Sequence, residues 1–226
     1  MVRVAVVYQS GGGHTRALAE AAAAGAAGVE GVEAEVLEVR GAHVVDGRWR
    51  DEHVLAAVDR ADAVVFACTT YMGSVSAVFK AFLEGAFMSR WIEQRWKDKF
   101  AGGMTNSASQ NGDKLSTLIQ LNIFAMQMGM IWVGVSDPPG NNWSGGATTD
   151  INRLGSWLGA RGQSNGDQGP DQAPSPGDRL TAERYGRRIA QITGRWLGKS
   201  GYVTERISEE QLRAMNLAAA QRAGGQ

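Results

Sequence analysis

The sixteen residues MVRVAVVYQSGGGHTR (residues 1–16) decide the fold of this chain. Val2 to Tyr8 is a short, valine-rich apolar run, which is typical of a strand buried on both faces of a parallel sheet. A glycine-rich turn from Ser10 to Gly13 follows, and the alanine-rich segment from Thr15 to Ala27 favours a helix. Strand, turn and helix in this order predict the first unit of an α/β domain.

Four further apolar runs alternate with helical segments along the chain. The expected strands are Glu33 to Val39, Ala63 to Cys68, Phe100 to Thr105 and Met130 to Val135. The expected helices are Asp51 to Arg60, Ser76 to Met88, Leu115 to Met128 and one in which Tyr185, Ile189, Ile192 and Trp196 share a face. This alternation predicts one three-layer α/β/α domain over residues 1–198, with a five-stranded parallel sheet of order 2-1-3-4-5.

Two segments depart from the alternation. Residues 137–178 are dense in Gly, Pro, Ser, Asn and Asp, which predicts a long irregular loop. Whether residues 159–177 are ordered without a ligand stays open. The pattern Ser-Glu-Glu-Gln at 208–211 is a capping box and predicts a short helix in a tail over residues 199–226, whose role is unassigned.

Composition narrows the class of protein. Lys plus Arg and Asp plus Glu both number 23, so no basic excess favours nucleic acid. No stretch approaches the ~18 apolar residues of a membrane helix. The single cysteine, Cys68, excludes an internal disulfide and indicates a reducing compartment. His43, Asp46 and His53 have no metal-ligand spacing. We therefore expect a soluble cytoplasmic protein without a metal, a membrane or a nucleic-acid partner.

The first glycine-rich turn carries the strongest chemical signal. Backbone N–H groups of Gly11, Gly12, Gly13 and His14, with the hydroxyls of Ser10 and Thr15, suit a phosphate monoester at a helix N-terminus. The turn lacks the Gly-Lys-Ser/Thr of a P-loop, and Arg16 stands where the dinucleotide fingerprint needs a glycine. The alternative interpretation is a tight turn without a ligand.

The loops after the third and fourth expected strands are polar and contain small residues. They can offer backbone groups to a flat heterocycle such as the flavin ring, with Tyr71 and Met72 as an apolar wall. Ordinary βα turns look similar, so the joint placement of the loops is what favours a site. The candidate residues are Thr70, Tyr71, Met72, Gly73 and Ser74, then Asn106, Ser107, Ala108 and Gly112.

With these motifs, the chain resembles the flavodoxin superfamily, and most of all the WrbA-type NAD(P)H:quinone oxidoreductases (tryptophan repressor-binding protein family). The resemblance covers residues 1–197. It rests on Ser10 to Thr15, Thr70-x-x-Gly73-Ser74, Asn106-Ser107-Ala108, Gly146-Ala147-Thr148 and Leu180 to Gly186. It implies FMN, NADH or NADPH as reductant, a quinone or other aromatic acceptor, and a homo-oligomer, a dimer or tetramer.

The chain departs from the family pattern near the flavin. Tyr71 replaces an arginine, and Met128 replaces a histidine. We expect these changes to affect the choice of acceptor and the flavin potential more than the binding of FMN. The flavin carries the chemistry, so we expect no catalytic side chain. Trp91, Met128 and Trp143 are candidates for a substrate pocket, with core packing or a subunit interface as the alternative.

Other functions are compatible with the same fold. They are a flavodoxin-type electron carrier, a flavin-holding interaction module and an NAD(P)H:FMN reductase. A carrier crowds its flavin with carboxylates, but the flavin loops here contain only Asp113 and the net charge is zero. These features favour the enzyme.

Overall fold

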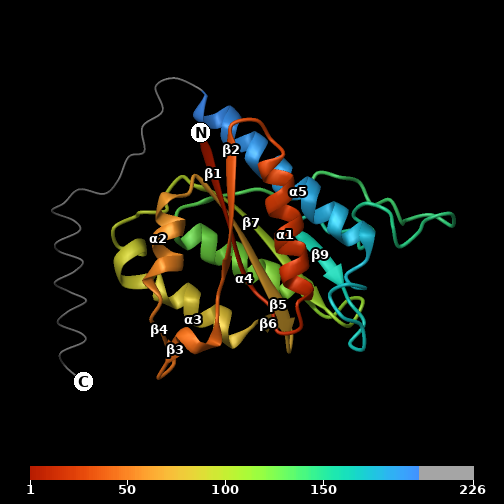
Figure 1. Ribbon diagram of the computed structural model, residues 1–226, viewed down its shortest axis with the longest axis horizontal. Coiled ribbons are helices and arrows are strands. Elements are labelled where there is room, and N and C mark those ends of the chain that lie inside the picture. Colours follow the sequence, from red (N-terminus) through yellow and green to blue (C-terminus); the bar gives the residue numbers. More distant parts are fainter. Residues whose placement is uncertain (199–226) are drawn as a thin grey trace.

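The computed structural model describes residues 1–198, apart from the side chain of Met88, as a central sheet between two layers of helices (Figure 1). The main strands are β1 (Val2–Gln9), β2 (Val32–Glu38), β5 (Ala63–Tyr71), β7 (Phe100–Ser107) and β8 (Ile131–Trp132). They run parallel in the order β2-β1-β5-β7-β8, so the predicted fold class and strand order are confirmed.

Strand β1 shows why the sequence forms a doubly covered sheet. Its alternate residues enter two separate cores, because side chains of a strand point to opposite faces. Val4 and Val6 join the core beneath α1 (His14–Ala27) and α5 (Pro176–Leu197). Ala5 and Val7 join the core beneath α2 (Glu52–Arg60), α3 (Ala77–Gly85) and α4 (Lys114–Gln127).

Small residues let α1 and α5 pack backbone to backbone. A Cβ on Gly25 would lie 1.8 Å from the carbonyl oxygen of Glu183, and one on Gly186 would lie 2.0 Å from that of Ala22. No larger residue fits these two positions. The alanine-rich composition of α1 therefore serves a close helix pair, which sets the position of the first turn of α1.

The prediction of an irregular loop over residues 137–178 is wrong in part. The short strand β9 (Ala160–Gln163) lies within it and pairs with the second half of β7, where β8 pairs with the first half. The edge of the sheet is thus one strand position split by a long insertion. Strand β9 has no apolar run because only Ala160 and Gly162 face the core, so its sequence does not resemble a buried strand.

A buried ion pair anchors this insertion. Arg153 Nη2 lies 2.7 Å from Asp178 Oδ2, and both side chains are almost fully buried. The same carboxylate accepts from the backbone N–H of Gln163 at 2.9 Å. Residues 159–177, whose order the sequence leaves open, are thereby tied to α5.

The helix ends also differ from the predictions. Helix α5 begins at Pro176, within the segment predicted as a loop, because Ser175 accepts from the N–H of Asp178 and proline fits the first helical position. Helix α3 ends at Gly85 rather than Met88 and is followed by a π-helical turn, η2 (Phe87–Trp91). The predicted helix at residues 208–211 lies outside the described residues.

Short elements complete the fold. A 3-10 turn and a two-stranded hairpin, which the sequence did not suggest, precede α2, and β6 pairs antiparallel with β5. Their bounds are η1 (Gly41–His43), β3 (Val44–Val45), β4 (Arg48–Trp49) and β6 (Ser74–Val75).

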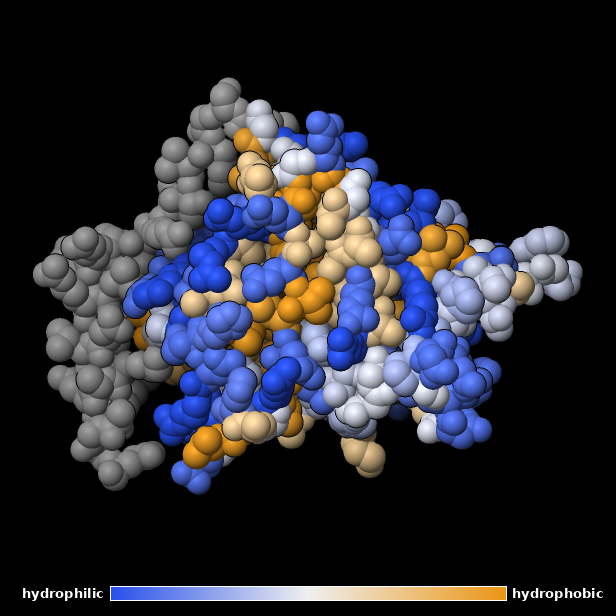
Figure 2. All heavy atoms as spheres, viewed as in Figure 1, coloured by the Kyte–Doolittle hydropathy of each residue, from blue (hydrophilic) through white to orange (hydrophobic). Residues whose placement is uncertain are grey.

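The surface is mixed in character. The segment between β8 and β9 projects from the body at the right of Figure 1, and Figure 2 shows mostly hydrophilic or intermediate residues there. Within residues 1–198, no helix combines the length and the apolar character needed to cross a bilayer.

Candidate functional site

The turn between β1 and α1 is built to bind an anion. Gly13 occupies the N-cap position with φ 87°, a left-handed conformation that favours glycine. No side chain caps α1 and no acidic residue lies in its first turn, so its N–H groups are free for a ligand. The buried Ser10 Oγ and Gln9 Oε1 have no hydrogen-bond partner among the described residues. Buried polar atoms are nearly always bonded, so this turn has the chemistry of a phosphate site.

Residues distant in the sequence close around this turn. His14 Nε2 donates to the carbonyl oxygen of Gln168 at 2.8 Å, which ties the start of α1 to the segment after β9. A Cβ on Gly13 would lie 2.8 Å from Pro170 Cγ, and one on Gly11 would lie 2.3 Å from the Tyr71 hydroxyl. The turn is therefore enclosed on two sides.

The second predicted loop is the tip of a hairpin between β5 and β6. Tyr71 pairs with Ser74, and both residues between them, Met72 and Gly73, have positive φ (48° and 73°). This is the conformation of a tight two-residue hairpin turn. It leaves Met72 fully exposed and Tyr71 half exposed. Ser74 Oγ instead donates to Gln120 Oε1 at 2.9 Å.

A threonine network that sequence reasoning missed fixes the strand ends. The hydroxyls of Thr15 and Thr69 share a hydrogen bond at 2.9 Å. Thr70 Oγ1 lies 2.7 Å from Thr105 Oγ1 and 2.8 Å from Thr117 Oγ1. Neighbouring hydroxyls at parallel strand ends are the only sequence signal for this network. It couples the first, second and third loops.

The third predicted loop is supported by a buried cation. Lys114 Nζ donates to Ser107 Oγ at 2.8 Å and to the carbonyl oxygen of Ser109 at 2.6 Å. Burial lowers the pKa of Lys114 to about 8, and the positive charge of Arg161 contributes in the same direction. Asn106 Oδ1 accepts from Ser164 Oγ at 3.1 Å. Sequence reasoning missed Lys114 because a lysine opening a helix ordinarily extends into solvent.

These loops enclose a cavity of about 790 Å³, which we call the loop cavity. It is lined by Ser10, Gly12, His14, Thr69, Thr70, Tyr71, Met72, Gly73, Asn106, Ser107, Ala108, Ser109, Gly112, Asp113, Ser164 and Gly166. Most predicted cofactor residues meet here. Gly11, Gly13, Thr15 and Ser74 are adjacent in the chain to lining residues but do not line the cavity themselves. Ser164 and Gly166 come from the segment after β9 and have no signal in the sequence.

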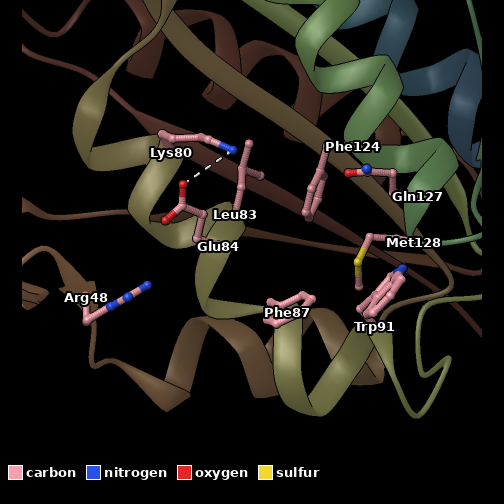
Figure 3. Close-up of a pocket in the computed structure, with 9 residues that line it drawn as sticks. All are labelled: Arg48, Lys80, Leu83, Glu84, Phe87, Trp91, Phe124, Gln127 and Met128. Carbon is pink, nitrogen blue, oxygen red and sulfur yellow. Dashed lines mark ion pairs between the residues drawn. The ribbon is translucent and has the colours of Figure 1, made fainter. Parts of the chain in front are cut away.

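The predicted substrate residues do not join this cavity. Trp91 and Met128 line a separate hollow of about 440 Å³, the aromatic cavity, which shares no residue with the loop cavity. Its lining comes from β4, α3, η2 and α4 (Figure 3): Arg48, Lys80, Leu83, Glu84, Phe87, Trp91, Phe124, Gln127 and Met128. Trp143 lines neither cavity; it is exposed and donates to the carbonyl oxygen of Gly140.

The loop cavity fits FMN. The anion cradle after β1 and the polar loops after β5 and β7 lie along the same edge of the sheet, as a phosphate joined to a flat ring requires. Its volume lies within the range of about 300–1,000 Å³ for small-molecule sites. Within residues 1–198, no cluster of His, Cys, Asp and Glu could hold a metal.

Comparisons with known proteins agree with this geometry. The chain is 39% identical over 193 residues to "Flavodoxin FldP" of Pseudomonas aeruginosa, which covers 85% of this chain and 97% of that protein. It is 32% identical to an "NAD(P)H dehydrogenase (quinone)" of Geobacter sulfurreducens, covering 87% and 100%.

Among solved structures, a WrbA-like flavodoxin from Agrobacterium tumefaciens is 34% identical, with a TM-score of 0.64 over 86% of this chain and 99% of that one. The predicted resemblance to the flavodoxin superfamily is thereby confirmed. The model of one family, "NADPH-dependent FMN reductase", matches residues 2–140. The chain therefore belongs to the NADPH-dependent FMN reductase family.

Proposed function

We propose that this chain binds FMN in the loop cavity and transfers electrons from NADH or NADPH to a quinone-like acceptor. One observation carries the proposal: the buried Ser10 Oγ has no partner within the described chain and lies in a glycine turn that leads into a helix N-terminus. The family description names FMN, and several relatives at 27–32% identity are named NAD(P)H dehydrogenase (quinone).

The residues of the loop cavity divide the task of holding the cofactor. Ser10 and the N–H groups from Gly11 to His14 would bind the phosphate, while Thr15 supports them through Thr69. The hairpin at Tyr71 and Met72 and the loop that contains Asn106, Ser107, Ala108 and Gly112 would hold the ring. Bound FMN supplies a ring that accepts a hydride from NAD(P)H and passes two electrons onward. The chain orients the ring and excludes water.

The direct test uses the purified full-length protein. We expect flavin absorption bands in the visible spectrum, anaerobic bleaching by NADH or NADPH, and recovery when benzoquinone is added. Bound FMN that neither nicotinamide can reduce would contradict the proposal. The relative rates with the two nicotinamides identify the physiological reductant.

An electron carrier is the second candidate, because the relative at 39% identity is named a flavodoxin. Among residues 1–198, Asp113 is the only acidic residue that lines the loop cavity, whereas a strongly reducing carrier needs several carboxylates there. Slow reduction by nicotinamides together with fast reduction by a separate reductase would favour the carrier. Loss of flavin on gel filtration after reduction would favour a flavin reductase.

We also infer a homo-oligomer, a dimer or tetramer, that assembles through α4. Leu115, Ile119, Ile123 and Met126 follow one another at helical spacing along this helix and are 42–53% exposed. A continuous apolar stripe of this kind is typical of a protein interface. Light scattering should show that the native protein is a multimer and that Ile119→Glu forms a smaller species. The control Leu180→Glu, on α5, should keep the native size. A monomeric native protein would contradict the inference.

The chemistry of Cys68 supports a cytoplasmic location. This sole cysteine is fully buried, and burial raises the pKa of its thiol to about 11, so it stays protonated and unreactive. A protein without disulfides suits a reducing compartment. Cell fractionation with an antibody tests the inference, and recovery outside the cytoplasmic fraction would contradict it.

A further inference from the structure

A buried lysine lies directly behind one wall of the loop cavity. Lys114 is the first residue of α4 and has no solvent-exposed surface. Its ammonium bonds Ser107 and Ser109, and both of these residues line the cavity. A contact between Lys114 and a ligand is therefore indirect, through Ser107 and its neighbours.

A second cation accompanies it. Arg161 on β9 is aligned with Thr105 on β7, next to the loop that Lys114 supports. Its Nε is buried without a hydrogen-bond partner in the described part of the chain, and burial lowers the pKa of the guanidinium. Its charge is close enough to Lys114 to lower the pKa of that amine. Two like charges thus lie near each other, behind the loop that follows β7.

The surrounding acids do not balance these charges. Asp178 attracts Lys114 but is already paired with Arg153, whose charge repels Lys114. Asp113 precedes Lys114 in the chain, yet its side chain does not cap α4. Among residues 1–198, neither Lys114 nor Arg161 forms a salt bridge. A cation at a helix N-terminus is moreover unfavourable. This arrangement costs stability, and such costs are concentrated at functional sites.

We propose that Lys114 and Arg161 stabilise the negative charge that reduction places on bound FMN, and that both are positioning residues that favour the reduced cofactor. The inference rests on the proposed function. A hydride carries one proton and two electrons, so its transfer from NAD(P)H leaves one negative charge on the ring and needs no further proton. The phosphate turn occupies one side of the cavity, and the two cations lie behind the loop on the other side.

The test compares the affinities of the full-length protein for oxidised and reduced FMN. Lys114→Gln should weaken binding of reduced FMN at least tenfold more than binding of oxidised FMN. That ratio lowers the two-electron midpoint potential by about 30 mV. Arg161→Gln should act in the same direction by a severalfold ratio, and Arg161→Lys, which keeps the charge, should restore it. Lys80→Gln, a change of an exposed lysine on α3, serves as the control and should leave the ratio unchanged.

The pH dependence of the potential is the second readout. We expect the native protein to take up one proton per two electrons near neutral pH, and Lys114→Gln to take up two, because the reduced ring then becomes protonated. Equal weakening of oxidised and reduced FMN would overturn the inference and leave Lys114 a support of the loop. If Lys114→Gln does not fold, Arg161, which is only partly buried, gives the same comparison. Failure of the native protein to bind FMN would overturn the proposed function itself.

Discussion

The two cavities of this chain differ in how their polar atoms are satisfied. Among residues 1–198, the loop cavity has a buried polar atom without a partner at Ser10, and a cation without a salt bridge lies behind its wall. The aromatic cavity has a satisfied ion pair, with Lys80 Nζ 3.5 Å from Glu84 Oε1. Phe87 and Trp91 stack there, with ring centroids 5.3 Å apart.

This difference teaches that concavity alone does not identify a site. Packing of side chains leaves hollows between helices, and a hollow whose polar groups are already paired needs no ligand to satisfy them. Unsatisfied polar atoms, by contrast, cost free energy unless a ligand bonds them. The loop cavity is therefore the candidate for chemistry, while the aromatic cavity suits an apolar partner surface.

The largest expected effect tests the buried charge behind the loop cavity. The pKa of Lys114 is about 8 in the folded protein and 10.5 when unfolded, so the unfolded chain binds more protons between these values. The contribution of Lys114 to stability should therefore rise with pH from about 8 to 10.5, by about 3 kcal/mol at 1.36 kcal/mol per unit, while the raised pKa of Cys68 acts in the opposite direction above pH 9. The difference in stability between the native protein and Lys114→Met, measured by urea unfolding against pH, should follow this rise, and Lys80→Met should stay parallel to the native protein. An identical rise in both variants would remove Lys114 as its source.

The sequence predicts more of the fold than of the candidate site. Residues 1–16 suffice for the first unit because a continuous apolar run, three glycines and an alanine-rich helix agree with one another. Strand β9 is not predicted from the sequence because its pairing with β7 depends on a tertiary contact rather than on periodicity. The start of α5 was readable from Ser175-Pro176, a cap followed by a proline.

The candidate site likewise has one part that the sequence predicts and one part that it does not. The phosphate turn lies within a few consecutive residues, so the sequence places its atoms. Lys114 and Ser164 contribute through contacts that only the folded chain makes. Trp91 was expected in a substrate pocket or a subunit interface because of its residue type, and residue type alone does not determine which cavity a side chain lines. Its proposed role in acceptor binding stays a prediction.

The next effect tests the left-handed glycine of the phosphate turn. Gly13→Ala should lower FMN affinity about 100-fold, because the left-handed conformation costs about 1–2 kcal/mol and Pro170 Cγ would lie 2.8 Å from the new Cβ. The matched control is Gly47→Ala in the turn between β3 and β4. Gly47 has φ 71° but no atom within 4 Å of its ideal Cβ. Gly47→Ala should lower the stability of the protein without lowering its FMN affinity. An equal loss of FMN affinity in both variants would show that the change in Gly13→Ala comes from general destabilisation. Fluorescence titration of FMN measures both.

A smaller effect follows for the orphaned hydroxyl. Ser10→Ala should lower FMN affinity about tenfold, since a hydrogen bond to a charged group contributes about 1.5–3 kcal/mol and water restores part of it. The stability of the protein without FMN should not fall, because no hydrogen bond of Ser10 is lost. Ser74→Ala is the control, since its hydroxyl is already bonded to Gln120. Similar losses of FMN affinity in both variants would show that Ser10 has no specific role in phosphate binding.

The smallest effect concerns the aromatic cavity. Trp91→Ala should leave FMN affinity within twofold but lower the free energy of unfolding by about 1 kcal/mol, because the stack on Phe87 is lost and a stacked aromatic pair contributes about 0.5–1.5 kcal/mol beyond its burial. Calorimetry with FMN and urea unfolding measure the two quantities, with the exposed Trp143→Ala as control. A loss of FMN affinity in Trp91→Ala under conditions where the variant stays folded would mean that the cavities are coupled. A raised KM for benzoquinone with unchanged FMN affinity would instead support acceptor binding at Trp91, and would give the aromatic cavity a part in the reaction.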